Sequence, residues 1–205
     1  MSIPASSSPP PRAAVIIPAR GGSKRLPRKN IQLLLGRPMI DYSIAAGLGS
    51  RFVGAGNVYV STDDAEIADI ARASGAQVIA RPPELARDDV WTEPVIQHAV
   101  QVLEQDGSPI DIVIWMNACA PEVQASDIDH AVERLLKENL REVFAVDEQL
   151  RSTSIVRAVR REALFQGRLS VKCAVMILPY VDIHYQEDLK KAEARLVKRE
   201  KDLGR

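Results

Sequence analysis

The chain has 205 residues, and its 27 lysines and arginines balance 27 aspartates and glutamates, so its formal net charge is zero. This balance argues against a whole-molecule electrostatic grip on nucleic acid and confines any anion site to a local cluster of cations. The length fits one domain with a substantial hydrophobic core.

The N-terminal segment, residues 1–12, is rich in serine and proline and lacks an apolar core. It is therefore expected to be a disordered tail and not a signal peptide. No stretch approaches the roughly 18 apolar residues that span a bilayer, so no membrane partner is expected. The two cysteines form no CxxC pair, which argues against a zinc knuckle or a disulfide framework. We expect a cytoplasmic protein.

Apolar runs and helical periods alternate along the chain. The expected strands are Ala13–Ile17, Val58–Ser61, Ala76–Ala80, Ile110–Met116 and Val143–Val146. The expected helices are Pro38–Leu48, Glu66–Ser74, Glu93–Gln105 and Asp127–Asn139, with proline in the first turn of the first helix and Thr92 and Ser126 as caps of the last two. This alternation predicts a three-layer α/β/α, Rossmann-like fold with a mainly parallel sheet.

The C-terminal part is less regular. Strands are expected over Ile155–Val159 and Leu169–Leu178, with a short helix over Arg160–Phe165 between them. An amphipathic helix is expected over Gln186–Lys201.

Four loops directly follow strands, and the carboxyl ends of parallel strands share one edge of a sheet. We therefore expect these loops to converge on a ligand site: Pro18–Asn30, Thr62–Asp64, Arg81–Trp91 and Asn117–Ala125.

The first of these loops is strongly cationic. Residues 20–29 read RGGSKRLPRK and carry five cations and no acid. Gly21 and Gly22 allow the backbone to approach a ligand and to point N–H groups at it. Arginine can bind phosphate oxygens bidentately and lysine adds a point charge, so a nucleoside triphosphate is the expected ligand. The alternative is a solvated basic surface loop. The loop has neither the Walker A nor the GxGxxG spacing.

The residues IIPARGGSKRLPRKNI around this loop resemble the acylneuraminate cytidylyltransferase family, whose members make CMP-sugars from CTP and sugar acids. Further similar segments follow in the same order: VSTDDAEIADIA from Val60, RPPELARD from Arg81, SDIDHAVERL from Ser126 and VDIHYQEDLKKAE from Val181. The resemblance covers roughly residues 13–196 and implies a nucleotidyltransferase fold in a single domain, residues 13–205.

The resemblance also implies an activity and a set of site residues. The implied reaction transfers CMP from CTP to a nonulosonic-type sugar acid and releases pyrophosphate, with Mg²⁺, or Mn²⁺, as cofactor. The implied catalytic residues are Arg20, Lys24 and Lys29. The implied nucleotide-binding residues are Arg20, Gly21, Gly22, Ser23, Lys24, Lys29, Asn30 and Arg81, and the implied metal ligands are Asp182 and His184.

The chain departs from the family pattern in three places. Asn117–Val123 replaces the family's QPTSPLR, so the residues expected to touch the sugar acid differ, and Glu122 is expected to repel a carboxylated acceptor. Asp182-Ile183-His184 replaces a DID motif, and imidazole suits Zn²⁺, Mn²⁺ or Fe²⁺ better than Mg²⁺; the alternative is that His184 is a polar strand-end residue without a metal role. Residues 146–155 cross directly a gap that holds the family's dimerising arm, so a homodimer is possible but lacks that arm.

Several alternatives stay open at this point. The protein could use a different acceptor or nucleotide, or bind nucleotide without catalysis. Asp63 and Asp64 could bind metal or ribose, although capping of the following helix is favoured. Cys119 is expected to be a small buried residue and not a nucleophile. Asp88 is expected to form a salt bridge with Arg87 or Arg81.

Overall fold

One sheet of seven strands organises the computed structural model of the chain, which describes residues 11–167, 170–181, 183–202 and 204. The strand order is β5-β4-β1-β6-β8-β7-β9. The strands are β1 (Ala13–Pro18), β4 (Val53–Thr62), β5 (Gln77–Ala80), β6 (Ile112–Met116), β7 (Glu142–Val146), β8 (Ser152–Arg160) and β9 (Cys173–Ile177). Of these seven, β8 alone runs antiparallel to its neighbours, which confirms a mainly parallel sheet.

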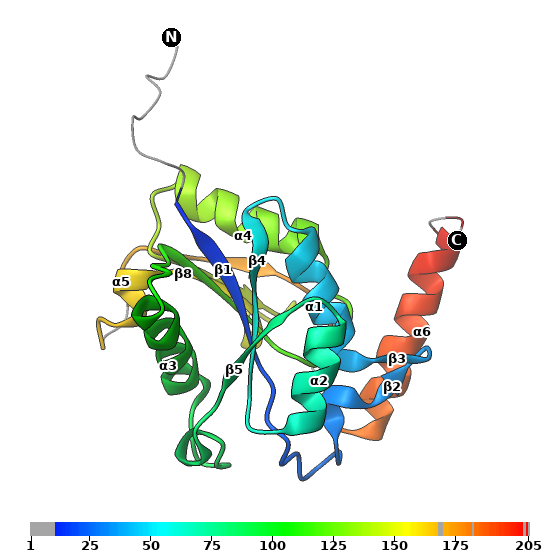
Figure 1. Ribbon diagram of the computed structural model, residues 1–205. Helices are drawn as coiled ribbons and strands as arrows, with labels where there is room; N and C mark the ends of the chain where they lie inside the picture. The colour runs from blue at the N-terminus through cyan, green and yellow to red at the C-terminus, as the bar shows by residue number, and fades with distance from the viewer. Residues whose placement is uncertain (1–10, 168–169, 182, 203, 205) are drawn as a thin grey trace.

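Helices cover both faces of the sheet (Figure 1). One face carries α1 (Met39–Gly49), α2 (Ala65–Ala73), α4 (Ala125–Lys137) and α6 (Gln186–Asp202), and the other carries α3 (Thr92–Gln105) and α5 (Arg161–Leu164). In β1, Val15 and Ile17 belong to the first core while Ala14 and Ile16 belong to the second, because alternate side chains of a strand point to opposite faces. The predicted three-layer architecture is confirmed.

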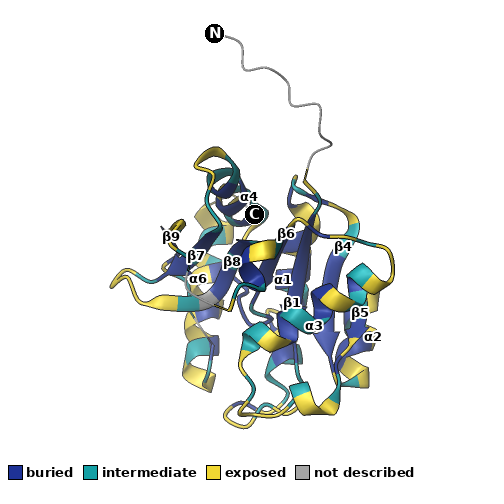
Figure 2. Cartoon of the chain, turned by 90° about the vertical axis from the view of Figure 1, so that its left-hand side faces the viewer, coloured by how far each residue is buried: buried dark blue, intermediate teal, exposed yellow. Residues whose placement is uncertain are grey.

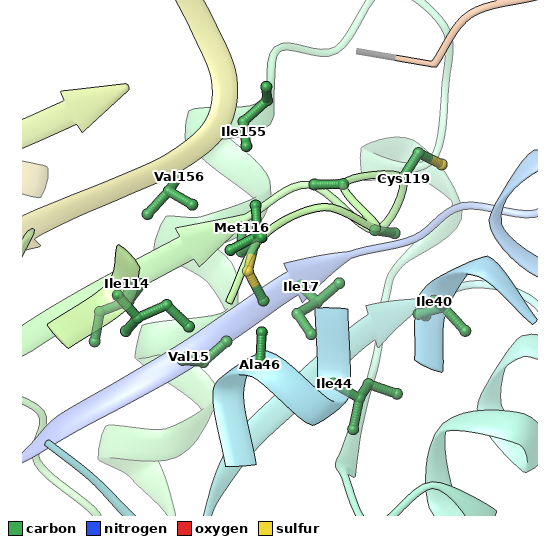
Figure 3. Packing of buried hydrophobic residues seen from close by; sticks show 14 of the residues in the cluster. Val15, Ile17, Ile40, Ile44, Ala46, Ile114, Met116, Cys119, Ile155 and Val156 are labelled. Carbon is green, nitrogen blue, oxygen red and sulfur yellow. The ribbon is translucent and has the colours of Figure 1, made fainter. Parts of the chain in front are cut away.

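The inner strands β1, β6 and β7 are buried, the edge strands β5 and β9 are partly exposed, and the outer sides of the helices are exposed (Figure 2). In the larger core, Ile17 of β1 and Met116 of β6 pack with Ile44 and Ala46 of α1 (Figure 3). Ile17, Ile44 and Met116 are fully buried. Each contributes about 1.5–3 kcal/mol relative to an exposed side chain, so strand β1 is firmly anchored beneath the cationic loop.

Two features differ from the sequence prediction. Strand β4 begins at Val53 and not at Val58, because Gly54–Asn57 form an irregularity in its pairing with β1 that hides the strand pattern. A small hairpin of β2 (Leu33–Leu34) and β3 (Arg37–Pro38) was missed. Leu35 and Gly36 join the two strands with φ of +50° and +78°, a turn in which leucine is an unusual choice.

Helix starts were predicted with mixed success. Asp64 caps α2, accepting a hydrogen bond from Ile67 N at 3.0 Å, as favoured from the sequence. The prediction for α4 was wrong: Gln124, not Ser126, is the N-cap, because the Asp127 carboxylate reaches back to Gln124 N at 2.9 Å. Thr92 lies inside α3, whose N-cap is Trp91.

The N-cap of α1 is Pro38, so this proline precedes the first turn and does not lie within it. In the C-terminal part, β8 and α5 occupy the predicted positions with shifted ends. The strand predicted over Leu169–Leu178 is shorter, β9 at Cys173–Ile177, and residue 169 lies outside the described residues.

Residues 1–10 of the predicted tail also lie outside the described residues. Arg12, at its end, contacts the folded domain: Arg12 N donates to Asp111 Oδ2 at 2.8 Å and its guanidinium donates to Asn57 Oδ1 at 3.1 Å. Across the described part of the chain, no helix combines the length and the apolar character needed to cross a bilayer.

Candidate nucleotide site

A pocket of about 320 Å³ opens at the carboxyl edge of the sheet. The loop after β1 and the loop that precedes α3 both lie at this edge, the lower one in Figure 1. The pocket is lined by these two loops, by Trp115 and Asn117 at the end of β6, by Thr92 and Val95 of α3, and by His184 before α6. The predicted convergence is therefore confirmed for three of the four loops. Among the described residues of the lining, the ionised or titratable groups are Arg20, Lys24, Arg25, Lys29, Arg81, Arg87, Asp88 and His184.

Asn30 holds the two ends of the cationic loop together. Its side chain is buried, donates from Nδ2 to Arg20 O at 2.9 Å and accepts at Oδ1 from Cys119 Sγ at 3.0 Å. Cys119 N in turn donates to Asn117 Oδ1 at 3.0 Å. Cys119 is fully buried, as expected, but its thiol also ties the cationic loop to the loop after β6.

The two glycines of the loop have different surroundings, and neither lines the pocket. Gly21 N donates to Asp63 Oδ1 at 3.1 Å, so Asp63 supports the cationic loop and does not cap α2. A Cβ added to Gly21 would lie 2.5 Å from Asp64 Oδ2, whereas a Cβ on Gly22 would meet open space. Gly21 is therefore required by packing, whereas Gly22 has room for a side chain.

Arg28 points out of the site. It pairs with Asp64 and Glu66 at the start of α2, and its hydrogen bond holds the pKa of Asp64 below the ordinary value. The loop thus divides its cations between folding and the pocket.

Three cations of the pocket, Arg20, Lys24 and Lys29, are the residues for which the sequence implied a catalytic role. Lys29 Nζ donates to the carbonyl oxygen of Ile183 at 2.9 Å, which links the cationic loop to the segment before α6. Arg20 and Lys24 both form salt bridges with Asp88. The prediction that Asp88 pairs with Arg87 or Arg81 was therefore wrong. Arg87 instead pairs with Asp89 at 2.7 Å.

Arg81 is a buried part of the pocket wall. It donates from Nη2 to Ser61 O at 2.6 Å and from Nε to Ser61 Oγ at 3.3 Å, which joins the end of β5 to the end of β4. Burial lowers the pKa of Arg81 to about 10, and the charge of Asp63 acts in the opposite direction. Its guanidinium therefore remains protonated at neutral pH.

An aromatic residue that sequence reasoning missed completes one wall. Trp115 at the end of β6 lines the pocket together with Thr92 and Val95 of α3. The Arg157 guanidinium lies 4.7 Å from the Trp115 ring centroid, a cation–π geometry. Strand alternation could have placed Trp115 beside Val113 on the α3 face, but it does not reveal that this face opens into a pocket.

The replaced segment Asn117–Val123 contributes little to the pocket. Asn117 lines it, whereas the side chains of the other residues are buried in the core. The expectation that Glu122 repels an acceptor was wrong. Glu122 is buried, its Oε1 pairs with Arg195 of α6 at 2.6 Å, and its Oε2 accepts from Val181 N at 2.7 Å.

Residues 179–181 and 183–185 thus form a strap fixed from several sides. Glu122 holds Val181, Lys29 holds Ile183, and the Asp188 carboxylate accepts from His184 N at 3.0 Å and from Tyr185 N at 2.9 Å. These contacts place His184 at the pocket. The other predicted metal ligand, Asp182, lies outside the described residues. The described residues contain no group of three or more His, Cys, Asp or Glu side chains suited to hold a metal ion.

Comparisons with known proteins agree with this geometry. A pseudaminic acid cytidylyltransferase of Campylobacter jejuni is 37% identical over 134 residues, covering 65% of this chain and 57% of the relative. A CMP-N,N'-diacetyllegionaminic acid synthase of Legionella pneumophila is 40% identical over 126 residues, covering 60% of this chain and 52% of the relative. The chain thus spans little more than half the length of these relatives.

A solved structure supports the fold. The structure of a CMP:2-keto-3-deoxy-manno-octonic acid synthetase in complex with CTP superimposes with a TM-score of 0.71 at 18% identity, covering 92% of this chain and 99% of that one. The family model described as cytidylyltransferase matches residues 14–175, which include the cationic loop, Arg81 and the end of β6. On this match and on the cationic pocket, the chain belongs to the cytidylyltransferase family.

Proposed function

We propose that this protein transfers CMP from CTP to a sugar acid of the nonulosonic class and releases pyrophosphate. The observation that supports this most strongly is the pocket at the carboxyl edge of the sheet, which places six cations against a single described carboxylate. A triphosphate compensates such a cluster, and the family membership makes CTP the expected nucleotide.

In the proposed reaction, a hydroxyl oxygen of the acceptor forms a bond to the α-phosphorus of CTP. The bond from that phosphorus to the α,β-bridging oxygen breaks, pyrophosphate leaves with the electron pair, and the hydroxyl proton passes to solvent. Arg20, Lys24 and Lys29 stabilise the charge that develops on the phosphates. Holding both substrates in line in one pocket supplies a further part of the acceleration.

The remaining predicted residues have supporting roles in this proposal. Ser23 and the open backbone at Gly22 approach the phosphates, while Gly21 and Asn30 fix the loop that carries them. The cytosine lies near Arg81, whose buried guanidinium holds the ends of β4 and β5 in place.

Mg²⁺, or Mn²⁺, is the proposed cofactor. Mg²⁺ usually keeps several waters and binds through substrate phosphates and one or two protein groups, so the absence of a larger ligand cluster among the described residues fits this mode. His184 and Asp182 would hold the ion, which supplies charge neutralisation on the phosphates when bound. Imidazole favours Mn²⁺ over Mg²⁺ at this position.

A second candidate keeps the nucleotide side and changes the acceptor. The burial of Ala118, Cys119, Ala120, Glu122 and Val123 favours it, because these positions replace the family's QPTSPLR motif and none of them reaches the pocket. Asn117, Trp115 and the strap residue His184 then remain as the described groups that an acceptor could meet.

Pyrophosphate release tests both candidates. The full chain is incubated with each nucleoside triphosphate and a panel of sugar acids, in Mg²⁺ and separately in Mn²⁺. Release with CTP and a nonulosonic acid supports the first candidate, and release with CTP and another acceptor supports the second. Binding of CTP without turnover on every acceptor would instead support a nucleotide-binding protein without catalytic activity.

A further inference from the structure

The loop that precedes α3 lies against the cationic loop through one carboxylate. Asp88 pairs with both Arg20 and Lys24, and Arg20 Nη1 also approaches Ala86 O at 3.5 Å. Asp88 therefore contacts two of the three cations that the proposed function assigns to the triphosphate.

Asp88 is opposite in charge to the cations that line this pocket. Among the described residues that line it, six are cations and Asp88 is the single carboxylate. Hydrogen bonds from Lys24 and Arg20 hold the pKa of Asp88 below its ordinary value, so it is charged at neutral pH. An anionic ligand thus meets one fixed negative charge at the cations it needs.

Three other cations of the two loops have partners that a triphosphate need not displace. Arg28 pairs with Asp64 and Glu66, Lys29 donates to a backbone carbonyl, and Arg87 pairs with Asp89. Arg20 and Lys24 are different, because their carboxylate partner lies in the pocket itself.

We infer that Asp88 occupies the place of a phosphate group, and that a bound triphosphate takes Arg20 and Lys24 from it. This inference rests on the proposed function only in taking a nucleoside triphosphate as the ligand. A carboxylate and a phosphate present similar oxygen acceptors to guanidinium and ammonium groups, so one can replace the other on the same donors.

Displacement of Asp88 should also change the free energy of unfolding little. Arg87, Asp88 and Asp89 are exposed, and neighbouring Trp91 is 84% exposed. The loop from residue 86 to residue 91 can therefore swing away without opening the core. Asp88 lowers the affinity for the triphosphate because it competes for Arg20 and Lys24. The loop moves when the triphosphate displaces Asp88 from these two cations.

Equilibrium binding of inorganic tripolyphosphate without divalent metal tests the inference. The full chain is compared with Asp88→Asn and with Asp69→Asn, a matched control that removes the same charge from an exposed ion pair with Arg72 away from the pocket. Two exposed ion pairs compete with the ligand, so Asp88→Asn should bind tripolyphosphate about threefold to tenfold more tightly. Asp69→Asn should change affinity by less than about twofold, because neither Asp69 nor Arg72 lines the pocket and salt screens an exposed charge outside it.

Equal or weaker binding by Asp88→Asn would overturn the inference, as would an equal gain in both variants. Thermal unfolding of each variant verifies that it is folded. Tripolyphosphate has no nucleobase, and no acceptor sugar is present, so the result does not depend on turnover. A tighter Asp88→Asn in a protein that never releases pyrophosphate would uphold the inference and contradict the proposed function. Failure of all three proteins to bind tripolyphosphate would contradict both.

Discussion

Replacing Gly21 by alanine tests the packing of the cationic loop. The new Cβ would lie 2.5 Å from Asp64 Oδ2 and 3.0 Å from Asp64 Cβ. Asp64 cannot yield freely, because it caps α2 through Ile67 N and pairs with Arg28. Loss of such a cap costs about 1 kcal/mol, and inserting a group into a packed site costs about 1–3 kcal/mol. We expect the free energy of unfolding to fall by about 1–3 kcal/mol, or about 2–12 °C in Tm.

The control is Gly22→Ala. Its Cβ meets no atom within 4 Å, so its free energy of unfolding should stay within about 0.5 kcal/mol of the parent. Its affinity for CTP should nevertheless fall, because the added methyl group occupies backbone space left open to the phosphates. Thermal unfolding and equilibrium CTP binding are measured for both variants. Equal Tm values for the two variants, or full CTP affinity in Gly22→Ala, would refute the reasoning.

Three further predictions concern the strap and its supports. Glu122→Ala should lower the free energy of unfolding by about 1–3 kcal/mol in chemical denaturation, because Val181 N loses its acceptor; an unchanged value would show that the strap is held otherwise. Burial, and then Asp127, raise the pKa of Tyr180 to about 12, so the contribution of Tyr180 to stability is intact below pH 10 and is lost from pH 10 to 12. The free energy of unfolding of Tyr180→Phe should therefore fall less than that of the parent over this pH window. Parallel curves of unfolding free energy against pH for the two proteins would contradict this. His184→Asp should lower the ratio of the Mn²⁺-supported to the Mg²⁺-supported rate of pyrophosphate release, and an unchanged ratio would exclude His184 from the metal site.

Interactions between residues close in sequence explain which parts of the fold the sequence could predict. The buried strands β1 and β6 read as continuous apolar runs, and Asp64 stands where a helix needs a cap. The convergence of the loops follows from a parallel sheet, so most of the pocket lining falls in loops that the sequence predicts to meet.

The missed features depend on contacts between distant residues. Asp88 and Arg20 are 68 positions apart, and the sequence offers Arg87 as a nearer partner; the fold decides between them. Glu122 looked like an exposed charge in a loop because Arg195, its partner, lies in the last helix. Pairing choices of this kind arise from tertiary packing, which neither composition nor periodicity encodes.

The central claim is that the cationic pocket transfers CMP from CTP. CTP labelled at the α-phosphate, supplied with nonulosonic acids and Mg²⁺ or Mn²⁺, tests it most directly. We expect the α-label to move into a sugar nucleotide and label from γ-labelled CTP to appear in pyrophosphate. Retention of the α-label in CTP, or its release as free CMP with every acceptor, would contradict the claim.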